Sequence, residues 1–177
     1  MGANEVRHGR HSLYLVSESQ TTIVDGPCRR ATIDDLDALV ALGERFVAYA
    51  PYGDAVRATA GGIAEGLRNV FAAPAGVVFV AERDGEIAGA LVGLMTAPWC
   101  APDTRVATEL AWWVDERRRR SPAAVRLLRA FEAWARDHGA ACVVMSDLVM
   151  CDGTTPAGPL FRRLGYQLVE RAHIRQV

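Results

Sequence analysis

Apolar residues recur at helical spacing through the first part of the chain. Between positions 33 and 48 they fall three or four residues apart, at Leu36, Leu39, Val40, Gly43, Phe46 and Val47. This period predicts an amphipathic helix over 33–48. Thr32 followed by Asp35 resembles a capping box with Asp in place of Glu, and Pro51 stands where the helix ends.

A second helix and a hairpin follow. Apolar residues again recur at helical spacing between 55 and 72, although three glycines weaken that helix. The pattern then changes to two apolar runs at 76–82 and 86–95, separated by Asp84-Gly85. An Asp-Gly pair between such runs is the strongest short-range indication of a β-hairpin.

The second half predicts alternating strands and helices. The expected elements are a strand at 105–114, a helix at 121–138, a strand at 142–148, a helix at 155–164 and a strand at 166–175. A strand–helix–strand unit of this length implies a parallel pair with a right-handed crossover. With a short strand at 28–31, the order is β-α-α-β-β-β-α-β-α-β, which predicts an α/β fold with a mixed sheet.

The chain of 177 residues is long enough for one domain. The first 26 residues are polar apart from two short apolar patches, and they read either as a loose arm or as an added hairpin. We expect residues 27–177 to form the single globular domain.

Composition and charge narrow the function classes. Half of the residues are hydrophobic, and 20 basic residues balance 21 acidic ones, so a protein that simply coats nucleic acid is disfavoured. No apolar run approaches the roughly 20 residues of a membrane helix, and the chain start has no secretory pattern. We expect a cytoplasmic protein without membrane contact. The four cysteines and four histidines show no metal-ligand spacing, so we expect reduced thiols and no metal.

The most informative stretch is 109–128. A hydrophobic strand ends at Val114, four arginines follow at 117–120, and Ser121-Pro122 suits the start of a helix. The free N–H groups and positive dipole end of a helix N-terminus bind anions, phosphate above all. The alternative is that the arginines form only a solvated turn.

This stretch resembles the acetyl-CoA-binding motif of the GNAT superfamily, V-x-P-x-x-(Q/R)-x-x-G-x-(G/A)-x-x-L-L. The matching residues are Val114, Arg119, Ala124, Leu127 and Leu128. Glu116 replaces the motif's proline, and Pro122 replaces its first glycine and removes an N–H. Residues 160–166 also resemble the family's L-Y-x-x-L-G-(F/Y) segment, so the resemblance covers roughly residues 28–177.

The resemblance implies a splayed sheet that takes acetyl-CoA as cosubstrate between the strands at 105–114 and 142–148. The pantetheine arm is expected near Val114, the pyrophosphate on amides from Arg119 to Ala124, and the acyl carbonyl near the Trp112 amide. The expected cofactor-binding residues are Trp112, Val114, Arg119, Arg120, Ser121, Ala123, Ala124 and Phe161. Phe161 stands where many relatives have a Tyr that protonates the departing thiolate, so we expect it to pack under the pantetheine arm.

Glu109 is the expected catalytic base, because the family often places a Glu on this strand. It lies five residues before Val114, whereas a spacing of six is also common. One residue of shift turns a side chain to the other face of a regular strand, and a bulge would restore it. The alternative is a solvated strand carboxylate.

Several other residues are candidates for the acceptor side. Trp112 and Trp113 are adjacent and must point to opposite faces, one toward the core and the other toward the acceptor. The weaker candidates are Tyr49 and Tyr52 as a lid, and Ser146 and Asp147 in the pocket.

The resemblance favours an N-acetyltransferase that moves an acetyl group from acetyl-CoA to a primary amine. The alternative is a CoA-binding regulatory or interaction module with little or no turnover, which Pro122 and Phe161 favour slightly. A nucleotide-phosphate binder of another family is disfavoured, because neither GxGxxG nor GxxxxGK(S/T) is present. Near-neutral charge favours a small-molecule acceptor, while a nucleic-acid acceptor and a homodimer stay open.

Overall fold

The computed structural model describes residues 28–52, 55–119 and 121–177, so the expected N-terminal arm or hairpin lies outside the described residues. The strands are β1 (Cys28–Arg30), β2 (Gly76–Arg83), β3 (Glu86–Thr96), β4 (Val106–Val114) and β5 (Cys142–Val144). The α-helices are α1 (Leu36–Tyr49), α2 (Ala60–Ala72), α3 (Ala123–Asp137) and α4 (Gly158–Arg163). Short 3₁₀ turns lie at Ile33–Asp35 and Glu116–Arg118.

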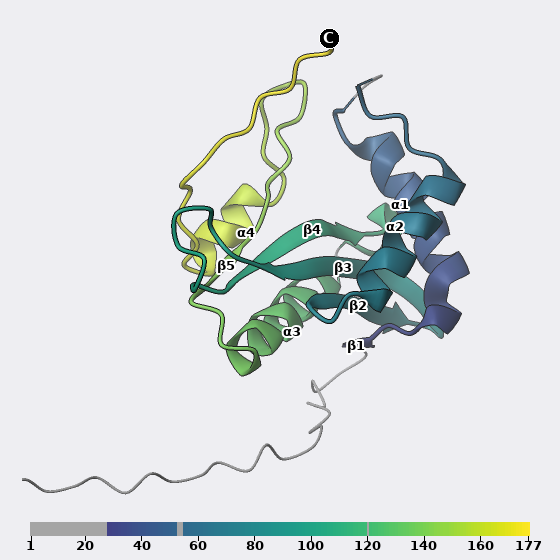
Figure 1. Ribbon diagram of the computed structural model, residues 1–177. Coiled ribbons are helices and arrows are strands. Elements are labelled where there is room, and N and C mark those ends of the chain that lie inside the picture. Colours follow the sequence, from purple (N-terminus) through teal and green to yellow (C-terminus); the bar gives the residue numbers. More distant parts are fainter. Residues whose placement is uncertain (1–27, 53–54, 120) are drawn as a thin grey trace, which may run out of the picture.

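The five strands form one open sheet in the order of the chain (Figure 1). Neighbours from β1 to β4 are antiparallel and β4 with β5 is parallel, which confirms the predicted mixed sheet. The predicted hairpin is also confirmed. Asp84 and Gly85 both have positive φ, 56° and 77°, as a type I′ turn requires.

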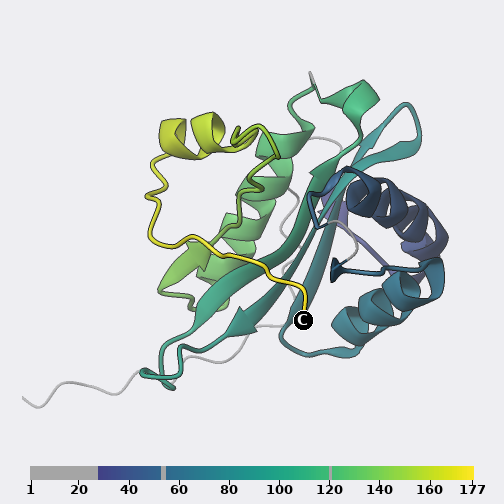
Figure 2. The same cartoon turned by 90° about the horizontal axis from the view of Figure 1, so that it is seen from above.

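Helices cover both faces of the sheet. Figure 2 shows α1 and α2 on one side, with α3 and α4 on the other. The α3 side holds a core of fully buried side chains around Phe131, Leu127 and Leu91. The α1–α2 side holds a second core around Leu39, Leu42 and Trp113. The apolar periodicity of these elements therefore produces a three-layer α/β domain.

Two strand predictions are wrong. The strand expected at 142–148 stops at Val144, because the next polar groups bond elsewhere: the Ser146 amide bonds a side chain of β4, and Asp147 accepts a bond from Ala157. The strand expected at 166–175 does not form. Leu168 and Val169 are 71% and 84% exposed, so this segment buries no apolar face against the sheet.

The helices begin later than predicted. The first opens with a 3₁₀ turn at Ile33–Asp35, with both halves of the predicted capping box present. The second starts at Ala60, because the Thr59 hydroxyl accepts a bond from the Gly62 amide at 3.1 Å and caps it there.

Candidate active site at the separation of β4 and β5

A β-bulge in β4 sets the direction of the candidate base. Val92 of β3 pairs with Ala111, and Gly93 pairs with Glu109, so Leu110 is an extra residue without a partner in β3. Residues opposite each other in an antiparallel pair share a face. Gly93 faces α3, because a Cβ there would overlap the Phe131 ring. Glu109 therefore points to the α3 face, where the bulge restores the orientation that its odd spacing from Val114 would reverse.

The Glu109 carboxylate is buried, with only 8% of its surface exposed. The Ser146 amide donates a hydrogen bond to its Oε2 at 2.9 Å. Burial raises the pKa of Glu109 to about 7, although the Ser146 bonds act in the opposite direction. A carboxyl group with this pKa changes its charge near neutral pH, as a general base for amine chemistry requires.

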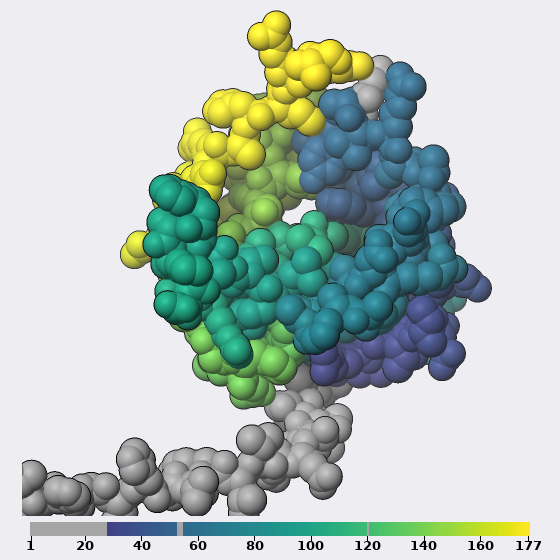
Figure 3. Space-filling model, in the orientation of Figure 1, coloured from purple at the N-terminus to yellow at the C-terminus, as the bar shows by residue number. Residues whose placement is uncertain are grey.

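Glu109 lies where β4 and β5 part. Their parallel pairing ends at Thr108 with Val144, one residue before Glu109. Beyond this point the segment after β5 is joined to β4 through the hydrogen bond from the Ser146 amide to Glu109. Figure 3 shows a hollow above β4, bounded by the α1–α2 segment and by the yellow C-terminal segment.

Aromatic side chains line the α4 side of the gap. The Trp112 ring lies 5.4 Å from that of Phe161, which in turn lies 5.3 Å from Tyr166. The Tyr166 hydroxyl donates to Glu132 of α3 at 2.8 Å, so α4 is anchored to α3. Phe161 is buried between its two aromatic neighbours.

Asp147 lies at the start of α4. Its Oδ1 accepts a bond from the Ala157 amide at 3.2 Å, and burial raises its pKa. This position gives Asp147 a capping role. Of the two weaker pocket candidates, the structure therefore brings only Ser146 to Glu109.

The start of α3 is shaped by Ser121 and Pro122. The Ser121 hydroxyl accepts a bond from the Ala123 amide at 3.4 Å. Pro122 is the N-cap residue and not the first residue of the helix, so α3 begins one residue later than Ser121-Pro122 predicted. The missing N–H of Pro122 therefore costs α3 no internal bond. A cavity of about 590 Å³ opens beside Ser121 and Ala123, with the turn of the β2–β3 hairpin as its other wall. Ala124 is half-buried and packs against the α3-side core.

The three described arginines before α3 lie in different environments. Arg118 donates to Asp84 at 3.0 Å and to Glu86 at 2.8 Å, so it fixes the hairpin turn. The Arg119 guanidinium lies over the Tyr49 ring at 4.4 Å and over Trp113 at 4.3 Å, on the α1–α2 side. Arg117 is exposed, and Arg120 is outside the described residues. Arg119 thus lies on the opposite face from Ser121 and Ala123, which its place in the motif does not reveal.

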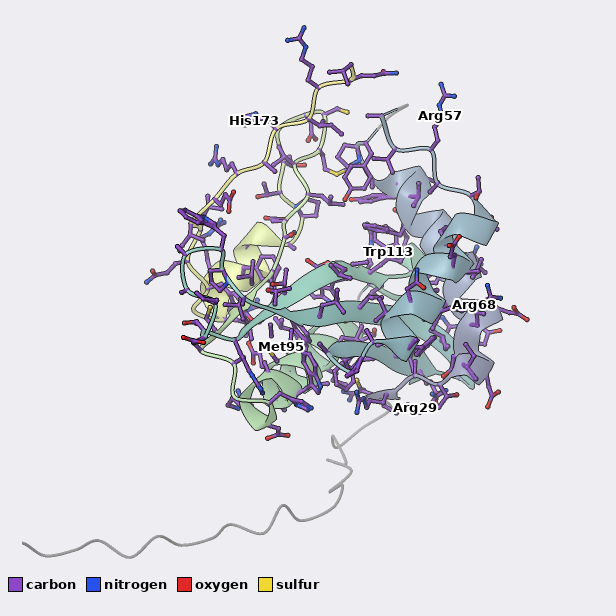
Figure 4. All side chains as sticks on the ribbon, viewed as in Figure 1. Arg29, Arg57, Arg68, Met95, Trp113 and His173 are labelled. Atoms are coloured by element: carbon purple, nitrogen blue, oxygen red, sulfur yellow. The ribbon has the colours of Figure 1, made fainter. Side chains whose placement is uncertain are left out.

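The two adjacent tryptophans point to opposite faces, as predicted. Trp112 faces α4, and Trp113 projects from β4 toward α1 and α2 (Figure 4). Trp113 contacts Tyr49 at 4.7 Å and Phe46 at 5.6 Å between ring centres. Val114 is buried in the core on the α3 side.

Tyr52 follows α1 and lies close to the candidate base. Its ring meets Phe46 edge-on at 6.5 Å. Burial and the negative charge of Glu109 both raise the pKa of Tyr52. The structure therefore brings one of the two predicted lid residues to the site, whereas Tyr49 is held by Arg119.

An apolar groove between the helix pair and the sheet was not predicted from the sequence. Its volume is about 270 Å³, and it is lined from β4 by Leu110, Ala111 and Trp113. Gly43 of α1 and Gly66 of α2 lie on its other side. A Cβ at Gly43 would overlap Ile63, so this glycine lets the two helices pack closely, whereas a Cβ at Gly66 would meet nothing within 4 Å. Because glycine inside a helix is costly, Gly66 was the available sign of open space.

Other chemistry is sparse in the described part of the chain. All four cysteines are free thiols, and only Cys28 is buried. Within residues 28–52, 55–119 and 121–177, no group of three or more His, Cys, Asp or Glu side chains gathers as a metal site would require. In the same residues no helix has the length and apolar character needed to cross a membrane.

Solved structures share this fold. A tetramutant protein from Bacillus halodurans superposes with a TM-score of 0.71 at 16% identity, over 85% of this chain and 99% of that one. An acetyltransferase from Clostridium acetobutylicum, solved with acetyl-CoA, gives 0.64 at 14% identity over 84% and 94%. An aminoglycoside N-acetyltransferase in complex with CoA gives 0.66 at 15% identity over 85% and 93%.

No curated protein matches the sequence. The model of the acetyltransferase (GNAT) family matches residues 42–166. This span runs from α1 to the residues after α4 and includes the bulged strand, the Arg-rich turn and α3. The chain belongs to the GNAT acetyltransferase family.

Proposed function

We propose that this protein transfers the acetyl group of acetyl-CoA to a primary amine, with Glu109 as the general base. The observation that carries the proposal is the buried carboxylate of Glu109 at the point where β4 and β5 part. Its pKa of about 7 lets it accept a proton near neutral pH.

The reaction makes one bond and breaks another. The amine nitrogen bonds the acetyl carbon, the carbon–sulfur bond breaks, and CoA leaves as a thiolate. The nitrogen loses a proton, which the Glu109 carboxylate accepts directly or through water. Because thiols titrate near pH 8.5, the thiolate is a good leaving group and Phe161 need not supply an acid.

The acetyl-CoA site follows from the family resemblance. Backbone groups of Trp112 and Val114 would meet the pantetheine arm and the acyl oxygen, and Phe161 would pack beneath the arm. The pyrophosphate would lie on amides at the start of α3, with Ser121, Ala123 and Ala124 around it. Arg119 would contribute through its backbone, because its guanidinium is stacked on Tyr49 and Trp113.

A catalytically silent CoA-binding module is the second candidate. Pro122 and Phe161, which remove an amide and a hydroxyl common in the family, are the observations that favour it. A buried carboxylate with a raised pKa favours the enzyme, because such groups are costly and gather at functional sites.

The test combines binding with turnover. Calorimetry at millimolar acetyl-CoA is expected to show binding, and a thiol assay with a panel of primary amines is expected to show CoA release. Glu109→Gln is expected to keep acetyl-CoA affinity and lose turnover, while the exposed Glu65→Gln is the matched control on α2. No binding at all contradicts the CoA site, and binding without turnover on any amine supports the silent module.

A further inference from the structure

The groove between α1, α2 and the sheet has a composition suited to one kind of ligand. Every residue that lines it is apolar or glycine. Small-molecule pockets measure roughly 300–1,000 Å³, and this groove holds about 270 Å³, so its occupant is small. Gly66 leaves it open on the α2 side, since a Cβ there would meet nothing within 4 Å.

The groove adjoins the candidate base along β4. Leu110 and Ala111 line the groove directly after Glu109 in the chain, at an edge of β4 that no longer pairs with β5, so the groove and the carboxylate, which point to opposite faces, meet at this open edge. Consecutive Cα atoms are about 3.8 Å apart. Leu110 is 51% exposed although it is apolar, so the groove is open to solvent where Leu110 lines it.

A second contact links the groove to Glu109. Phe46 lines the groove and touches the Tyr52 ring edge-on. The charge of Glu109 acts on Tyr52, so the two side chains are near each other. An amine that lies in the groove would therefore reach the carboxylate past Tyr52.

The charges around the groove oppose a polycationic ligand. No carboxylate is among its lining residues. The ring faces of Tyr49 and Trp113, which are suited to hold a cation, are already occupied by Arg119. Its guanidinium also places a positive charge beside the groove wall formed by Trp113.

We infer that the acceptor is a primary amine on a small alkyl or aryl body, which lies in the groove lined by Leu110, Ala111 and Gly66 with its amino group toward Glu109. This inference rests on the proposed function and names the substrate class of the same site. Burial of the apolar body would supply affinity, and the single carboxylate would receive the one proton that the reaction releases.

The first experiment compares amines in the thiol-release assay. Ethylamine, butylamine, hexylamine and phenethylamine form the apolar series, and spermidine and kanamycin are the polycationic probes. We expect KM to fall by about fourfold for each added methylene until the groove is filled. A higher kcat/KM for spermidine or kanamycin than for hexylamine overturns the inference and leaves acetyl transfer to amines intact.

The second experiment measures binding without turnover. Calorimetry of hexylamine with the CoA-bound protein compares Gly66→Leu with Gly61→Leu, a glycine of the same helix that also faces open space but does not line the groove. We expect Gly66→Leu to weaken binding at least tenfold and Gly61→Leu to leave it unchanged. If hexylamine binds in this way but no amine is acetylated, the groove is supported and the proposed reaction is not.

Two results overturn the groove assignment. One is equal hexylamine affinity in both leucine variants and the unchanged protein. The other is a concentration-dependent dimer in sedimentation equilibrium that Gly66→Leu dissociates, because the groove would then be covered by a second copy of the chain.

Discussion

The two faces of the sheet differ in how densely their side chains are packed. On the α3 face, Leu91, Leu127 and Phe131 are fully buried, and Gly93 has no room for a methyl group beside Phe131. On the α1–α2 face, a groove remains open and Leu110 is half-exposed at its end. Interiors are normally packed as densely as organic crystals. The α3 face is therefore packed for stability alone, while the α1–α2 face has a core and also leaves room for a ligand.

The largest expected effect concerns Glu109, which projects from β4 on the α3 face. Loss of a general base commonly lowers kcat by about 10²- to 10⁴-fold. Glu109→Gln is expected to fall in this range, because the amide has the same shape and cannot accept the proton. In the unchanged protein kcat should rise with pH through about 7, as Glu109 loses its proton. A pH–rate profile that is the same in both proteins would assign proton transfer to a water chain.

Glu109→Gln is expected to lower activity but to raise the stability of the folded protein at neutral and higher pH. The folded protein binds the Glu109 proton more tightly than the unfolded chain does, because burial raises the pKa from 4.5 to about 7. The unchanged protein therefore loses stability as pH rises from about 4.5 to 7, and Glu109→Gln removes that loss. Urea unfolding at pH 5 and pH 8 should show the variant gaining relative to the unchanged protein, by up to about 3 kcal/mol at pH 8.

A pair of phenylalanines measures the packing of each face. Phe131→Ala is expected to cost about 3–5 kcal/mol, because it opens a cavity in the dense core. Phe46→Ala on the groove side should cost about 1–2 kcal/mol, since its ring is already beside open space. Urea unfolding gives both values. Equal costs would mean that the two faces are packed alike.

Arg119 tests how the Arg-rich turn before α3 is attached to the α1–α2 side of the sheet. Arg119→Ala is expected to lower stability by about 1 kcal/mol, because it removes the guanidinium from the Tyr49 and Trp113 rings. Arg119→Lys should restore little, since a lysine cannot stack as a plane. The exposed Arg117→Ala is the control and should stay within about 0.5 kcal/mol. Thermal unfolding that ranks Arg117 above Arg119 would contradict this attachment.

The smallest effect is expected at Phe161. Phe161→Tyr should leave acetyl-CoA affinity unchanged and kcat similar or modestly raised, because the added hydroxyl would meet the sulfur only as charge develops. Steady-state kinetics and calorimetry check both values. If Phe161→Ala changed neither folding nor turnover, the aromatic contact with Trp112 would have no part in the site.

Local patterns in the sequence predicted most of the fold. The Asp84-Gly85 turn, the two flanking strands and α3 depend on neighbours in the chain, so the sequence is enough to find them. The predicted strand at 166–175 failed for the opposite reason. Its apolar residues become a strand only if another strand pairs with them, and no described strand does so.

The sequence was enough to identify several residues of the candidate site, but not the directions in which their side chains point. Glu109 was found from its place before the motif. The face of the sheet to which its side chain points depends on a bulge, which only the pairing of β4 with β3 defines. Arg119 matched the motif, yet the α1 helix that its guanidinium meets lies far away in the sequence. The groove is a space between elements, which local sequence patterns do not describe.

The bulge at Leu110 has a consequence for the length of the chain. Without Leu110, Val92 would still face Ala111 and Gly93 would still face Glu109, so deletion would convert β4 into a regular strand with every recorded pair kept. The sheet therefore does not need this residue. A protein shortened by one residue at this position should fold and keep Glu109 on its face, while it loses a wall of the groove. Insertions and deletions, as much as substitutions, can thus remodel the groove of this domain.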